Sequence, residues 1–175
     1  MKFGLEIEIL HEDKDVNTRE LAKNMELAQA VLADPDKLEG AIIPYTNGKP
    51  AMAAFNDPLL PLLEQWMLKM PWCLGGDTET VFLKNSEHAF GFEPMSEALQ
   101  LSFYVGQGND VEQYILEPMA LSLENFCDVS VSAVKQVLDL IVKVKPGSDQ
   151  TGDVKNLKDA LAEADKALRE YRNQR

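Results

Sequence analysis

Histidine and cysteine are the residue types that most often act as nucleophiles, general bases or zinc ligands, and this sequence holds two of each. His11 and His88 have no second histidine or cysteine at ligand spacing, and Cys73 and Cys127 belong to no close-spaced pair. His88 alternates with Phe90 in a strand-like segment, which is typical of a packed histidine rather than of a ligand or a general base. The two cysteines are expected to be small buried apolar side chains. The sequence therefore predicts no catalytic residue, no metal site and no cofactor.

Two glycine-containing segments, residues 75–78 and 106–108, resemble phosphate-binding loops only in composition. Phosphate and dinucleotide loops lead into a helix, whose N-terminal N–H groups bind the anion. Both segments here lead into predicted strands, so we interpret them as turns. We therefore expect a protein that is not an enzyme. The alternative is an enzyme of unrecognised type, with carboxylates that converge from distant parts of the chain.

The chain is strongly acidic, with 29 aspartate and glutamate residues against 17 lysine and arginine residues, a net charge of −12 and a pI near 4.6. Such a surface repels the phosphates of nucleic acids and anionic lipids, so we expect neither nucleic acid nor a membrane as a partner. It favours a basic protein partner; the alternative is that the acidity only keeps the protein soluble. Glu6 and Glu8 fall where a targeting peptide needs its apolar core, so a cytoplasmic protein is expected.

The element that organises the fold is an amphipathic helix that begins near residue 59. Its apolar residues recur every three or four positions and so share one face; they are Leu59, Leu62, Leu63, Trp66, Met67 and Met70. Asp57 is the predicted N-cap, Pro58 the first helical residue, and Pro71 the residue that stops the helix. Trp66 is predicted to belong to the core and not to a binding site.

After a Gly-Gly-Asp turn the apolar period changes from helical to two, which predicts strands. Four such segments predict an antiparallel meander; they cover residues 79–84, 88–93, 98–105 and 111–117. Residues 3–9 alternate in the same way and are predicted to be the first strand of the same sheet. The Asn47-Gly48 pair between the apolar runs 40–45 and 51–55 predicts a hairpin.

Helices are predicted on both sides of the strands. Asn17 and Glu20 have the spacing of a capping box, and the helix they begin is expected to run to about Ala33. Near the C-terminus, two heptad-like stretches flank a breaker-rich linker and predict a helical hairpin over residues 122–174. Within it, the segment 124–132 fits a strand as well as a helix.

These elements predict an α+β fold, one domain over residues 1–175. An antiparallel sheet of about four to six strands packs with the amphipathic helix, and the C-terminal helical hairpin completes the fold. The last helix is charged on all but one narrow apolar stripe. This stripe either docks the helix on the rest of the chain or pairs it with a second copy, which would give a homodimer.

The stretch DPLLPLLEQWMLKMPWCLGGDTETVFLKNSEHAFGFEP resembles the helix-then-meander block of small bacterial immunity proteins, which neutralise a partner toxin of polymorphic or contact-dependent systems. The resemblance covers the middle of the chain and carries no motif that transfers residue by residue. It implies a stoichiometric inhibitor whose acidic surface covers a basic toxin domain, without cofactor and without turnover. The alternative from another class is a homo-oligomeric structural or regulatory protein.

The partner-binding surface predicted from the sequence is the face of the meander opposite the helix. By alternation this face carries Tyr104, Tyr114 and Glu112, while Asp77 and Glu79 lie near the preceding turn. Tyrosine anchors surrounded by carboxylates suit a basic protein. The alternative is that apolar residues of the C-terminal hairpin cover this face; these would be Val134, Leu138, Leu157 and Leu161. The two tyrosines would then be buried, whereas an interface requires them to be accessible.

Overall fold

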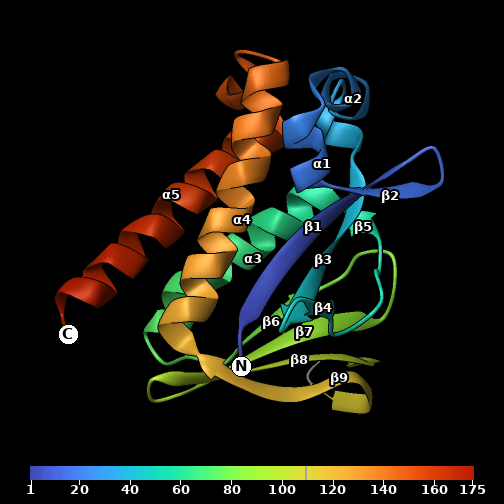
Figure 1. Cartoon of the computed structure of the whole chain (residues 1–175). Helices are drawn as coiled ribbons and strands as arrows, with labels where there is room; N and C mark the ends of the chain where they lie inside the picture. Colours follow the sequence, from blue (N-terminus) through green and yellow to red (C-terminus); the bar gives the residue numbers. More distant parts are fainter. Residues whose placement is uncertain (109) are drawn as a thin grey trace.

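The computed structural model describes residues 1–108 and 110–175; Asn109, in the predicted turn between the last two strands, lies outside the described residues. Within these residues the chain forms two antiparallel sheets and five α-helices, which confirms the predicted α+β class (Figure 1). The strands are β1 (Phe3–His11), β2 (Lys14–Asn17), β3 (Glu39–Thr46), β4 (Lys49–Pro50), β5 (Asp57–Pro58), β6 (Glu79–Phe82), β7 (His88–Met95), β8 (Ala98–Gln107) and β9 (Asp110–Ser122). The helices are α1 (Thr18–Lys23), α2 (Met25–Val31), α3 (Leu59–Leu74), α4 (Leu123–Val144) and α5 (Gly152–Asn173), with short 3-10 helices η1 (Pro35–Lys37) and η2 (Ser148–Gln150).

The first sheet has the strand order β2-β1-β3-β4, and β5 also pairs with β3. The predicted turn joins β3 to β4, and Asn47 and Gly48 both have positive φ (51° and 80°), as a tight hairpin turn requires. The predicted second arm, residues 51–55, is not a strand, because the chain leaves the sheet after Pro50. Phe55 instead packs on the other sheet, with its ring centroid 4.9 Å from that of Phe103.

The second sheet has the order β6-β7-β8-β9 and is the predicted antiparallel meander. Its apolar face is buried, with Phe92 and Leu101 fully inaccessible to solvent. One prediction is wrong: β1 belongs to the first sheet, so the expected single sheet is two sheets. The alternation in residues 3–9 shows that one face of the strand is buried, but it carries no information on which strand lies beside it.

Helix α3 runs past Pro71 and ends at Leu74, so the prediction that Pro71 stops the helix is wrong. A proline this close to the end of a helix removes one backbone donor, and the helix accommodates it. The extra turn places Cys73 in the core, where it is fully buried. Gly75 then closes the helix by donating its N–H to the Pro71 carbonyl at 3.1 Å.

Asp57 lies where the two sheets meet. It is 1% exposed, and its carboxylate accepts hydrogen bonds from the backbone N–H of Lys84, at 2.9 and 3.0 Å, and of Asn85, at 2.8 Å. These donors belong to the loop between β6 and β7, whereas Asp57 itself pairs with Gly40 of β3. The predicted N-cap role is therefore wrong: Pro58 occupies the N-cap, and the Asp57 side chain ties the first sheet to the second.

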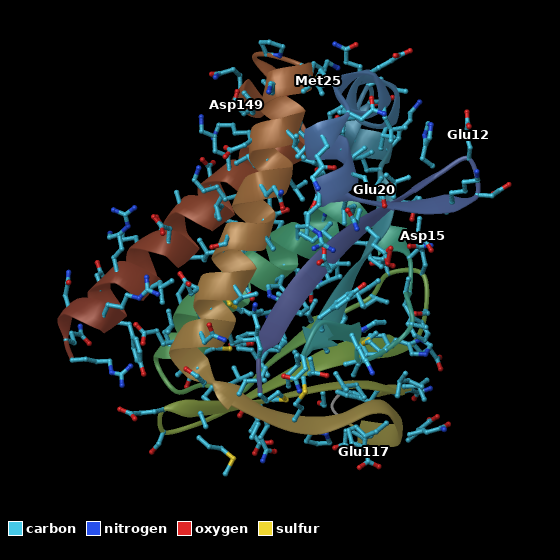
Figure 2. All side chains as sticks on the ribbon, in the orientation of Figure 1. Glu12, Asp15, Glu20, Met25, Glu117 and Asp149 are labelled. Carbon is cyan, nitrogen blue, oxygen red and sulfur yellow. The ribbon has the colours of Figure 1, made fainter. Side chains whose placement is uncertain are left out.

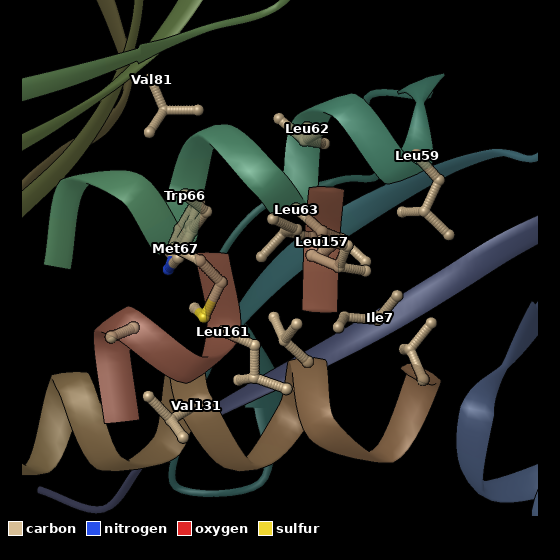
Figure 3. Packing of buried hydrophobic residues seen from close by; sticks show 14 of the residues in the cluster. Ile7, Leu59, Leu62, Leu63, Trp66, Met67, Val81, Val131, Leu157 and Leu161 are labelled. Atoms are coloured by element: carbon tan, nitrogen blue, oxygen red, sulfur yellow. The ribbon is translucent and has the colours of Figure 1, made fainter. Parts of the chain in front are cut away.

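Trp66 of α3 lies at the centre of the core and is 1% exposed, which confirms its predicted core position. Its ring lies edge-on to those of Phe90 and Phe92, at centroid distances of 4.9 and 4.7 Å. The indole Nε1 donates to the Ser130 hydroxyl of α4 at 3.0 Å. Figure 3 shows buried side chains of α3, α4, α5 and β1 packed together in the core. The buried residues of both sheets and these helices form one cluster.

The predicted C-terminal hairpin is confirmed as α4 and α5. Helix α4 begins at Leu123, because the Ser122 hydroxyl accepts the N–H of Asn125 at 3.2 Å and caps its first turn. The ambiguous segment 124–132 is therefore helical. The apolar stripe of α5 is buried inside the same chain, against α3 and α4. None of the helices in the described part of the chain has the length and apolar character needed to cross a membrane.

The first predicted helix is interrupted. Asn17 caps α1 as predicted by accepting the Glu20 N–H at 3.0 Å. The expected continuation to Ala33 is broken at Asn24, whose side chain accepts the N–H of Leu27 at 3.1 Å and begins α2. Asparagine side chains compete with the helix backbone in this way, so Asn24 splits the segment into two short helices.

Helix α3 also closes one edge of the second sheet. The side-chain amide of Gln65 donates to the Phe82 carbonyl at 2.9 Å and accepts the Phe82 N–H at 2.7 Å. The outer strand β6 thus has both backbone groups of this residue paired with a side chain. One turn further along α3, Lys69 forms an ion pair with Glu79 of β6 at 3.3 Å.

Candidate functional site

The face of the second sheet turned away from α3 holds the residues predicted to bind a partner, and we call it the outer face. Phe90 and Phe92 point to Trp66, so Ala89 and Gly91 point the opposite way. The strand register places four outer-face residues side by side across the whole sheet. This aromatic row consists of Phe82, Ala89, Tyr104 and Tyr114.

Tyr104, in the middle of the aromatic row, is only 4% exposed, so the expectation that it is accessible is wrong. At Gly91 an added Cβ would come within 3.3 Å of the Tyr104 ring and 2.7 Å of the Ser102 hydroxyl. The ring thus fills the gap that a glycine leaves in the sheet surface, and Tyr114 packs edge-on against it at a centroid distance of 6.2 Å. Only the ends of the row are open: Phe82 is 44% and Tyr114 41% exposed.

The C-terminal hairpin does not cover the outer face, so that alternative is also wrong. Val134 of α4 and Leu157 of α5 are buried in the core instead. Figure 1 shows both helices on the same side of the meander as α3. The burial of Tyr104 therefore comes from its neighbours within the sheet.

Glu112 is displaced from its predicted position by a β-bulge. Val105 pairs with Gln113, but the next residue, Gly106, pairs with Val111. Glu112 is the extra residue of this bulge, so the alternation of faces from Tyr114 does not extend to it. Val111, 40% exposed, shares the outer face with Tyr114, and Glu112 is exposed beside it.

A shallow hollow of about 310 Å³ lies on the outer face beside the aromatic row, towards the start of β6. Of the predicted residues, Glu79, Tyr104 and Tyr114 line it, and Gly91 and Ser102 also contribute. Glu79 is partly neutralised by its ion pair with Lys69. Asp77 is exposed in the turn before β6 and does not line the hollow.

Charge is distributed unevenly along the chain. Residues 75–122, which form the second sheet and its turns, contain eight carboxylates and one lysine, a net charge of −7. Residues 123–175, which form the helical hairpin, contain nine acidic and nine basic residues and are neutral. The second sheet therefore carries more than half of the net charge of −12. Glu117, on β9, projects from the lower margin of the molecule (Figure 2).

Three outer-face residues were missed by sequence reasoning. Phe82 was assigned to a strand, but its position in the aromatic row follows only from the register of β6 with β7. Val111 shares this face with Tyr114 because of the bulge at Glu112. Glu93 is opposite Gln100 and exposed, and its alternation with Gly91 could have identified it. Phe82 and Val111 could not be placed on this face from the sequence, because their positions depend on strand register and on a bulge.

The histidines and carboxylates do not gather into a metal site in the part of the chain that the structure describes. His88 is a packed histidine, as predicted: its ring stacks on Phe103 at a centroid distance of 5.3 Å and an interplanar angle of 10°. Its Nδ1 lies 2.9 Å from the Ser86 hydroxyl.

Comparison of the chain with models of protein families, with curated proteins and with solved structures finds no match.

Cys73 and Cys127 are both free and fully buried, as expected. Burial raises the pKa of the Cys73 thiol to about 12 and also raises the pKa of Cys127. Because the thiolate is the reactive species, both thiols should react with Ellman's reagent at pH 8 far more slowly in the folded protein than in denaturant.

The raised pKa values also predict alkaline destabilisation. The folded state holds the two thiol protons more tightly than the unfolded state. The stability that comes from these protonated thiols is complete below about pH 9 and is lost as the pH rises towards 12. Urea unfolding at several pH values should show a steeper loss for wild type than for a Cys73→Ala/Cys127→Ala variant. If stability fell equally steeply with pH in both proteins, the pKa values of the two thiols would not be raised in the folded state.

Proposed function

We propose that this chain is a non-catalytic binding protein that masks a basic partner protein, in the manner of an immunity-type inhibitor, and that the outer face of the second sheet makes the contact. One observation carries the proposal: exposed aromatic side chains lie on the same sheet as most of the unbalanced carboxylates.

The exposed apolar side chains can supply the binding energy. Strand pairing fixes the backbone of Phe82 and Tyr114, so no backbone ordering is needed when a partner covers them. Val111 extends the apolar area beside Tyr114. Aromatic side chains on a preformed surface are typical anchors of protein interfaces.

The carboxylates can supply selectivity for a basic partner and a fast association rate. Glu93 and Glu112 are exposed on this sheet and are not part of an ion pair among the described residues. A field of one sign steers an oppositely charged partner and repels acidic proteins. A second copy of this chain would present the same negative sheet, and the α5 stripe that could have paired two copies is already buried. A basic partner of different sequence therefore suits the surface better than self-association.

Charge reversal on the outer face tests this proposal. Chemical crosslinking in the cells that make the protein, followed by mass spectrometry, would identify the bound protein, which should be basic. With that protein purified, the Glu93→Lys/Glu112→Lys variant should associate about tenfold more slowly than wild type at low salt, because steering is lost. The measurement is the association rate by biolayer interferometry.

The matched control is Glu163→Lys/Glu170→Lys, which makes the same change in net charge on exposed positions of α5. Its association rate should stay within twofold of wild type. If both variants slow association equally, only net charge matters and the outer face is not the binding surface. An acidic bound protein would contradict the proposal as a whole.

A further inference from the structure

Trp72 is 59% exposed, more than any other aromatic side chain that the structure describes. It lies in the last turn of α3, a helix whose other large apolar residues are mostly buried. Leu68, one turn earlier on the same side of the helix, is 49% exposed. The outer surface of α3 thus ends in an apolar patch, and an indole ring is its most exposed part.

The turn that follows holds Asp77 beside Trp72. The Asp77 N–H donates to the Trp72 carbonyl at 3.0 Å, and the Gly76 N–H donates to the Cys73 carbonyl at 3.0 Å. Gly76 has a φ of +95°, which lets the chain reverse there. Pro71 restricts the backbone immediately before Trp72. These backbone hydrogen bonds hold Trp72 and Asp77 next to each other, and both residues are exposed.

The electrostatic field at the C-terminus of α3 and the following turn favours a cation. The C-terminus of α3 is the negative end of a sixteen-residue helix dipole, and its last turn contains no basic residue. Asp77 adds a full negative charge, and no ion pair in the described residues neutralises it. The nearby cation on α3, Lys69, is already paired with Glu79.

We propose that Trp72 and Asp77 form a receptor site for an arginine side chain of the partner. A guanidinium group is flat and weakly hydrated, so it can stack on the indole face while it donates to the Asp77 carboxylate. The site continues into the outer face, because Thr78 and Glu79, which follow Asp77, line the hollow. This inference rests on the proposed function and deepens it by naming the partner group that α3 binds.

An NMR titration of the intact protein with N-acetyl-arginine amide tests the site. The Trp72 indole N–H signal should shift in a saturable way. The Trp66 indole N–H, buried and bonded to Ser130, should not shift and is an internal control. N-acetyl-citrulline amide, a neutral compound of nearly the same shape, should leave the Trp72 signal unchanged, and the lysine analogue should bind more weakly than arginine.

Two variants separate the contribution of the Asp77 carboxylate to arginine binding from that of the Trp72 ring. Asp77→Asn, read from the Trp72 signal, should weaken arginine binding about two- to fivefold, the size of an exposed ion pair. Trp72→Ala, read from the Asp77 backbone N–H, should weaken it by a similar factor because the stacking is lost. Met95→Ala, which truncates an exposed apolar side chain on β7, should leave the affinity unchanged. Equal shifts with arginine and citrulline, a lysine analogue that binds as tightly, or unchanged affinity in both variants would overturn the site.

The outcomes for the two proposals are distinguishable. If the basic partner depends on Glu93 and Glu112 but binds the Trp72→Ala variant as tightly as wild type, the arginine site is wrong and the proposed function stands. If arginine binds at Trp72 and no basic partner is captured, the site stands and the proposed function is wrong.

Discussion

Replacing Trp66 with alanine is expected to lower the free energy of unfolding by about 3–5 kcal/mol, the usual cost of deleting a buried aromatic side chain. The ring fills the space between α3, β7 and α4, and its loss removes the edge-on contacts with Phe90 and Phe92. It also leaves the buried Ser130 hydroxyl without its indole donor. Domains of this size have a total stability of about 5–15 kcal/mol, so the variant should be close to unfolding.

Urea unfolding followed by far-UV circular dichroism measures this effect without relying on tryptophan emission. The matched control is Trp72→Ala, which removes an exposed ring from the same helix and should change stability by less than about 0.5 kcal/mol. Trp66→Phe should lower the stability less than Trp66→Ala, because it keeps most of the packing. It still loses the hydrogen bond to Ser130. A Trp66→Ala protein as stable as wild type would mean that α3 does not bury this face.

The second large effect is expected at Asp57. Replacing it with alanine should lower the free energy of unfolding by about 3 kcal/mol, because the backbone N–H groups of Lys84 and Asn85 lose a charged acceptor, and hydrogen bonds to charged groups contribute about 1.5–3 kcal/mol each. Since Asp57 is 1% exposed, water cannot readily replace the carboxylate.

Hydrogen exchange gives this prediction a local measurement. The amides of Lys84 and Asn85 should exchange faster in the Asp57→Ala variant, and the β6–β7 loop should loosen before the rest of the sheet. The control is Asp139→Ala, which removes an exposed aspartate that pairs with Lys135 on the surface of α4, and should cost less than about 1 kcal/mol. Unchanged exchange at both amides would show that the carboxylate does not hold the loop.

Features governed by neighbouring residues in the chain could be predicted from the sequence. The Asn17 cap, the Asn47-Gly48 turn and the four-strand meander depend on spacing within a few residues, and all three are confirmed. The core position of Trp66 follows from helical spacing in the same way.

Features that depend on distant partners could not be predicted. Nothing near Asp57 in the sequence indicates that its carboxylate binds a loop 27 residues later. Alternation along β9 fails at a bulge, so the position of Glu112 cannot be counted from Tyr114. The burial of Tyr104 depends on Gly91 in the neighbouring strand, and only the register brings the two together.

The two edges of the second sheet limit how another protein can attach to it. At β6 the Gln65 amide pairs with Phe82 much as a neighbouring strand would, and at β9 bulges interrupt the regular spacing of the backbone. Both features discourage the addition of a further strand, which is also the route by which sheets grow into fibrils. A protein that bound the second sheet as proposed would therefore contact its side chains, and it could leave again without breaking backbone hydrogen bonds between strands.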